Sequence, residues 1–178
     1  LEQQGVYFRE SSSTKPKVAF LFPGQGSQYT GMLRDLVNES KAAREIVKEL
    51  DAILFQHNAP RFADLAWTPN EQLGQDVFLT QLSILIADTL VARVLMNEGL
   101  RPDVISAHSY GEFPALVAAG AITFGDAIEI TRDRTNAVES RESTRGSLMS
   151  TTAPLDVVER LLSHLPGAAY LASHNAPD

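Results

Sequence analysis

Two kinds of hydrophobic pattern alternate along this chain. Val18-Ala19-Phe20-Leu21-Phe22 is a continuous apolar run that Pro23-Gly24 ends, and Val104-Ile105-Ser106 is a second short run. Short continuous runs are typical of parallel strands that are buried on both faces. We therefore expect a strand at each of these two places.

Longer stretches carry apolar residues at helical spacing. Between residues 41 and 56 they share one face and charges occupy the other, which predicts an amphipathic surface helix. Between about 77 and 96 they cover nearly the whole circumference, which predicts a central, buried helix. A further helix is expected over 112–119, directly after the second strand. A strand, a sharp turn and a helix thus follow one another there.

The C-terminal part continues the alternation. Thr123 with Asp126 predicts a capped helix over about 124–140. After a polar break at 142–146, we expect a strand, a helix and a strand over 147–151, 154–164 and 168–172. Strands and helices that alternate in this way indicate the α/β fold class.

The composition is that of a folded protein with one sizeable core. The chain has 178 residues, 44% of them hydrophobic and 21% charged, with a net charge of -7. An acidic chain is a poor match for broad binding to nucleic acid or an anionic membrane. No uncharged stretch reaches the roughly 18 apolar residues of a membrane span. The lack of cysteine excludes disulfides and thiolate chemistry, and it fits a reducing, cytoplasmic location.

The sharpest local signal is Ala107-His108-Ser109-Tyr110-Gly111. It matches the small-x-Ser-x-Gly nucleophile elbow, and it lies between a predicted strand and a predicted helix. This turn is strained and crowded, so the residues two before and two after the serine must be small. The serine side chain then points outward, near helix-start amides that can stabilise an oxyanion. The alternative is a serine that only caps a helix.

A glycine-rich loop, Pro23-Gly24-Gln25-Gly26-Ser27-Gln28, follows the first strand. A dinucleotide fingerprint would need a third glycine where Tyr29 stands, and no Gly-Lys-Ser or Gly-Lys-Thr ending marks a phosphate loop. Instead, the loop could present Gln25 and its backbone to the pocket where Ser109 emerges. The alternative is a turn whose glycines only satisfy backbone geometry.

Helix lengths predict that an arginine returns to the level of Ser109. The helix after Ser109 and the following one up to Arg134 each advance about ten residues, which at about 1.5 Å per residue gives matching lengths. If the two helices pair antiparallel, Arg134 can offer its planar cation to a carboxylate beside the serine. The alternative is a surface salt bridge of Arg134 with Glu129 or Asp133. Arg132 points roughly the other way and is expected to be exposed.

A general base is not evident. His108 adjoins the serine in the chain, where successive side chains diverge, so it is expected to pack or to orient the elbow. His174 lies in a loop with Asn175, and we keep His108 and Asn175 as candidate neighbours of the site. His57 in a loop and His164 near a helix end offer no link to the serine. No HExxH motif or carboxylate cluster supports a metal.

Four separated motifs occur together: Phe22-Pro23-Gly24-Gln25-Gly26-Ser27-Gln28, His108-Ser109-Tyr110-Gly111-Glu112, Ala115-Leu116-Val117-Ala118-Ala119-Gly120 and then Arg134. In this order they closely resemble the acyltransferases that load malonyl groups onto acyl carrier proteins. That family contains the malonyl-CoA:acyl carrier protein transacylases of fatty acid synthesis and the acyltransferase domains of polyketide synthases. The resemblance covers about residues 17–178, and the aromatic Tyr110 is more like the iterative type I synthases.

The resemblance implies a domain organisation. It predicts the N-terminal part of an α/β-hydrolase-like large subdomain over 15–140 and the first part of a ferredoxin-like small subdomain over 141–178. Residues 1–14 are predicted to be a linker or flanking segment. Family members carry the general base, a histidine, beyond the small subdomain. We therefore expect this chain to be a fragment of a complete enzyme, without the catalytic histidine.

The resemblance also implies roles for individual residues. Ser109 would be the nucleophile, Arg134 the clamp for the substrate's carboxylate, and the backbone amides of Gln25 and Tyr110 the oxyanion donors. The implied reaction transfers a malonyl-type acyl group from CoA to the phosphopantetheine thiol of an acyl carrier protein through a seryl-acyl intermediate. No metal or redox cofactor is expected. Neighbouring synthase domains are expected partners.

The sequence departs from the family pattern at one position of the elbow, and two other functions fit the same elbow. The family's first glycine of the elbow is Ala107 here, which should keep the turn with slightly tighter packing. The same elbow with water as acceptor would make a serine esterase or thioesterase. A docking module with a relic elbow is the second rival. A preference for malonyl or methylmalonyl is left open.

Overall fold

The computed structural model describes residues 16–68, 72–140 and 149–175. The chain forms two compact units, Leu1–Arg141 and Glu142–Asp178, and each is described by itself. The assignment of an α/β-hydrolase-like and a ferredoxin-like subdomain to these parts of the chain stays a prediction. Residues 1–14, expected as a linker, lie outside the described residues.

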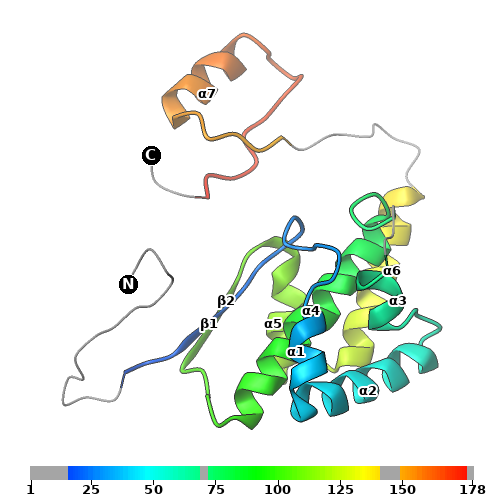
Figure 1. The fold of residues 1–178 in the computed structure, drawn as a ribbon. Helices are drawn as coiled ribbons and strands as arrows, with labels where there is room; N and C mark the ends of the chain where they lie inside the picture. The colour runs from blue at the N-terminus through cyan, green and yellow to red at the C-terminus, as the bar shows by residue number, and fades with distance from the viewer. Residues whose placement is uncertain (1–15, 69–71, 141–148, 176–178) are drawn as a thin grey trace. The chain divides into compact units, whose positions relative to one another are not determined.

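Two parallel strands position the candidate site in the first unit. β1 (Ala19–Phe22) pairs with β2 (Val104–Ala107), so that Phe22 lies opposite Ala107 at the carboxyl ends of both strands. Figure 1 shows the two strands side by side, next to α5. Because parallel strands end at the same edge, the loop after β1 and the turn after β2 meet there.

The burial of β1 differs from the sequence prediction. Phe20 and Phe22 pack with Ala92 and Ala115 of the neighbouring helices, but Leu21 on the other face is 76% exposed. The apolar run predicts burial on both faces. Only one face is covered here, because no described helix lies on the other.

The helices follow the predicted spacing wherever the pattern is long. The described helices are α1 (Arg34–Glu39), α2 (Lys41–Gln56), α3 (Phe62–Ala66), α4 (Val77–Asn97), α5 (Glu112–Ala118), α6 (Phe124–Glu139) and α7 (Leu155–Ser163). The bounds of α2, α4, α5, α6 and α7 lie within one residue of those predicted. The short helices α1 and α3 were not predicted.

Helix α4 is the centre of the core, as predicted. It contacts α2, α3, α5 and α6, and its leucines and isoleucines from Leu82 to Leu90 are almost fully buried. Asp76 caps its start by accepting a hydrogen bond from the backbone of Leu79. By length and composition α4 could cross a membrane, but 67% of that stretch is buried inside the protein. This burial is typical of the core helix of a globular domain.

Helix α6 begins with the capping box expected from the sequence. The Thr123 side chain accepts a hydrogen bond from the backbone of Asp126, and the Asp126 carboxylate accepts one from the backbone of Thr123. Both contacts satisfy amides that would otherwise lack partners at the helix start. The cap fixes where α6 begins, and so how far along the helix Arg134 lies.

The second unit differs from the prediction at its strands. Helix α7 is present, but residues 168–172 and the described part of 147–151 form no strand; residues 147 and 148 lie outside the described part. A strand needs a partner for its backbone hydrogen bonds, and no described segment of this unit supplies one. The strand predicted at 168–172 is therefore wrong, because an apolar run alone does not supply a pairing partner.

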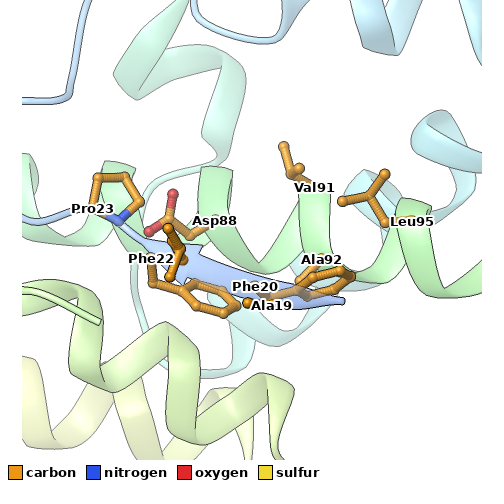
Figure 2. A pocket seen from close by; sticks show the side chains of 9 residues that line it. Ala19, Phe20, Phe22, Pro23, Asp88, Val91, Ala92 and Leu95 are labelled. Atoms are coloured by element: carbon orange, nitrogen blue, oxygen red, sulfur yellow. The ribbon is translucent and has the colours of Figure 1, made fainter. Parts of the chain in front are cut away.

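A cavity of about 280 Å³ lies beside β1, between the strand and α4. Figure 2 shows the Asp88 side chain of α4 near Phe22 and Pro23, while the rest of the lining is apolar. The Oδ2 atom of Asp88 is buried and has no hydrogen-bond partner among the described residues. Burial raises the pKa of the Asp88 carboxyl to about 7, because the apolar surroundings disfavour its charged form.

The raised pKa predicts a pH-dependent stability. At pH values between its ordinary pKa and 7, the Asp88 carboxyl keeps a proton in the folded state and loses it on unfolding. The stabilisation of the fold by this proton is therefore present in acid and is lost as the pH rises to 7. We expect the free energy of unfolding to fall by about 2 kcal/mol more between pH 5 and pH 8 than in Asp88→Asn. Urea denaturation of both proteins at the two pH values measures this. Parallel pH profiles would contradict it.

Candidate active site

Ser109 stands at the turn that joins β2 to α5. Residues Ser109–Gly111 form one turn of 3-10 helix, and Ser109 has a φ of 55°, in the left-handed region that non-glycine residues rarely adopt. The residue is exposed, so its hydroxyl is accessible to a reactant. The backbone N–H of Gly111 donates to the carbonyl of His108 and closes the turn. This is the geometry of a nucleophile elbow.

Two glycines are required by the close approach of this turn to the end of β1. A Cβ on Gly111 would lie 2.5 Å from the carbonyl oxygen of Phe22. A Cβ on Gly24 would lie 2.7 Å from the carbonyl oxygen of His108 and 2.9 Å from Cβ of Ser109. Real Cβ contacts are not this short, so each position excludes a side chain. The glycine-rich loop therefore packs directly against the serine.

The loop after β1 is a hydrogen-bonded turn. The backbone N–H and the hydroxyl of Ser27 both donate to the carbonyl of Gly24, and the N–H of Gly26 donates to the Gln28 side chain. No described residue accepts a hydrogen bond from the backbone N–H of Gln25. That amide follows directly after Gly24, which touches Ser109, so it is a candidate oxyanion donor.

A buried glutamine connects this loop to Arg134. Gln81 of α4 is only 4% exposed. Its side-chain amide donates to Oε1 of Gln25 at 3.3 Å, and its Oε1 accepts a hydrogen bond from Nη1 of Arg134 at 3.0 Å. Sequence analysis missed Gln81. The available signal was a polar amide in a helix whose apolar pattern predicts burial on nearly all sides.

The two arginines of α6 have different partners. Arg132 donates two hydrogen bonds to the Glu129 carboxylate and one to the carbonyl of His57. Arg134 pairs with no acidic residue of the described part of the chain, and its guanidinium lies over the ring of Phe113 at 5.9 Å. The alternative of a surface salt bridge between Arg134 and Glu129 or Asp133 is therefore wrong. Arg132 is paired and half-buried, where the sequence predicted exposure.

Neither His57 nor His108, the two histidines in the described part of the first unit, is hydrogen-bonded to Ser109. His57 Nδ1 lies 2.7 Å from Oε1 of Glu129, and this contact, together with Arg132, holds the pKa of the Glu129 carboxyl below its usual value. His108 is exposed, and its backbone N–H donates to the carbonyl of Phe22. Asn175 belongs to the second unit, so its role as a neighbour of the site stays a prediction.

Known proteins are similar to this chain in sequence and in fold. The sequence profile of the acyl transferase domain matches residues 19–178. The chain belongs to the acyl transferase domain family. Among curated relatives of this acyl transferase domain, the non-reducing polyketide synthase nscA of Arthroderma gypseum is 33% identical over 156 residues, which cover 86% of this chain and 9% of the synthase.

Smaller relatives match the same acyl transferase domain. The malonyl CoA-acyl carrier protein transacylase of Bacillus subtilis is 36% identical over 118 residues, 66% of this chain and 36% of that enzyme. A solved malonyl-transacylase in complex with its type II polyketide synthase acyl carrier protein superposes with a TM-score of 0.61 at 32% identity, over 70% of this chain and 39% of that one. This chain thus spans well under half of each relative.

The crowding at the elbow gives a test of this geometry. We expect Gly111→Ala to lower the free energy of unfolding by about 1–3 kcal/mol, because its methyl group meets the backbone of Phe22. The matched control is Ala107→Gly, at the other small position of the elbow, which adds no atoms. Chemical denaturation of both variants measures the difference. Equal stability of Gly111→Ala and the wild type would contradict the close packing.

Proposed function

We propose that this acyl transferase domain moves a malonyl-type acyl group from CoA to the phosphopantetheine thiol of an acyl carrier protein. One observation carries the proposal: Arg134, without an acidic partner among the described residues, is joined through Gln81 to the loop that packs on Ser109. A cation that is linked to the loop packed on an exposed serine suits an acyl group that ends in a carboxylate. The malonyl CoA-acyl carrier protein transacylase among the relatives supports the same substrate class.

In the first step, Oγ of Ser109 attacks the thioester carbonyl carbon and its proton passes to a base. The carbonyl oxygen becomes an oxyanion, which the backbone amides of Gln25 and Tyr110 stabilise. Each donor of this kind typically contributes about 2.7–4 kcal/mol to lowering the barrier. Collapse of the intermediate breaks the carbon–sulfur bond, CoA leaves as the thiol after taking up the proton, and a malonyl ester remains on Ser109.

In the second step, the thiol of the carrier protein attacks the ester carbonyl. It gives its proton to the base, passes through the same oxyanion position, and releases Ser109 when the proton returns to Oγ. Arg134 pairs with the free carboxylate of the malonyl group in both steps. The chemistry requires neither a change of oxidation state nor a metal.

The base is proposed to come from polypeptide beyond residue 178. Neither His57 nor His108 of the first unit is hydrogen-bonded to Ser109, and this chain covers 36% of the transacylase relative. A complete protein would then consist of this chain, the segment that carries the histidine and, in a synthase, neighbouring domains. The activity tests below therefore use the complete polypeptide.

The covalent intermediate is the first test. We expect intact-mass analysis after incubation with malonyl-CoA to show one malonyl adduct on Ser109, and none in Ser109→Ala, because only the serine hydroxyl forms the ester. Adding the phosphopantetheinylated carrier protein should move the malonyl group to its thiol. Release of free malonate at a rate that the carrier protein does not change would identify a hydrolase instead. No adduct at all would indicate a docking module.

The carboxylate clamp is the second test. We expect Arg134→Ala to lower kcat/KM for malonyl-CoA at least about tenfold, since a charge-assisted hydrogen-bonded pair is lost, and to affect acetyl-CoA far less. The control Arg132→Ala removes an arginine two positions away that pairs with Glu129. That variant should keep the wild-type preference for malonyl. If Arg134→Ala also keeps it, Arg134 is not the clamp.

A further inference from the structure

The side chain of Tyr110 runs from the elbow to helix α6. It is only 2% exposed, although Ser109 beside it is exposed. Its hydroxyl lies 2.7 Å from Oγ1 of Thr131, which is fully buried on α6. The residue after the candidate nucleophile is thus tied by a buried hydrogen bond to the helix that carries Arg134.

The direction of this hydrogen bond follows from its neighbours. Thr131 has a single hydroxyl proton, and it donates that proton to the carbonyl of Ala127 at 2.6 Å. Thr131 therefore accepts from Tyr110, and the phenol is the donor. Burial raises the pKa of the Tyr110 phenol, so it keeps the proton that it donates.

A second contact reaches Arg134 from the same tyrosine. The rings of Tyr110 and Phe113 pack with their centroids 5.3 Å apart, and the Arg134 guanidinium lies over the Phe113 ring. Thr131 and Arg134 are three residues apart on α6, so they lie on the same side of the helix. The Tyr110 hydroxyl and ring thus contact α6, directly and through Phe113, close to the turn of the helix that carries Arg134.

We propose that the buried Tyr110–Thr131 hydrogen bond fixes the distance between Ser109 and Arg134, so that Tyr110 is a positioning residue for the selection of carboxylate-bearing acyl groups. This role rests on the proposed function and adds to the oxyanion role of the Tyr110 backbone amide. An acetyl group has no carboxylate to place, so its reaction does not depend on the spacing of the serine and the arginine. A malonyl group must meet the serine and the arginine at once, so it depends on their spacing.

The test measures selectivity in the complete polypeptide. Ser109 acylation by malonyl-CoA and by acetyl-CoA is followed by quenched-flow mass spectrometry, and the malonyl-to-acetyl ratio of kcat/KM is compared among four variants. These are Thr131→Val, Tyr110→Phe, the double variant and the conservative Thr131→Ser, which keeps the hydroxyl. Both rates come from one preparation, so a loss of folded protein cancels in the ratio.

We expect each of Thr131→Val and Tyr110→Phe to lower the ratio about tenfold, because a small misplacement of a substrate-binding group costs this much or more. The double variant should lower the ratio no further, since both changes remove one interaction. Thr131→Ser should stay within about twofold of the wild type, because its hydroxyl still accepts the bond.

Three results would overturn the inference. The single variants could slow both thioesters by the same factor, which a merely structural hydrogen bond would cause. Their effects on the ratio could multiply in the double variant, which would make them independent. The wild-type protein could form a malonyl adduct on Ser109 with no preference over acetyl, which would show that Arg134 is not a carboxylate clamp. Failure to form the adduct at all would instead reject the proposed function.

Discussion

The candidate site depends on how closely the turn after β2 passes the end of β1. At Gly24 and Gly111 no space exists for a side chain, because the backbones of the two segments are in contact. This contact holds Ser109 against the loop that carries Gln25. From that loop, the side-chain hydrogen bonds through Gln81 reach Arg134. A backbone contact and one buried amide thus connect Ser109 of the elbow to Arg134 of α6.

The fold was predictable where a pattern was long enough to have a period. Helices α2, α4 and α6 carry four or more helical turns each, and their bounds follow from apolar spacing and, for α6, from the Thr123 cap. Helices α1 and α3 have five or six residues, too few to show a period. The expected strand at 168–172 failed for another reason: pairing is a property of two segments, and a single run of residues does not reveal its partner.

The site was predictable at its backbone features and less so at its side-chain pairs. Ser109 and the glycines were found because a tight turn restricts residue types at fixed spacing. The pairing of Arg132, expected to be exposed, was not predicted. It binds Glu129, three residues earlier, and its position also depends on His57 and Phe78, which approach from other segments. Gln81 and Thr131 were missed because their polar atoms act across helices, at a distance that no local pattern encodes.

At position 109, the left-handed backbone makes the residue that is best for stability different from the residue that the proposed reaction needs. Glycine adopts that conformation without the steric penalty that a Cβ brings, which for such residues is on the order of 1 kcal/mol. A chain selected only to stay folded would therefore favour glycine at 109 and would lose its hydroxyl. Among similar domains, a glycine at this position would mark a scaffold that has been retained for its shape after its nucleophile was given up.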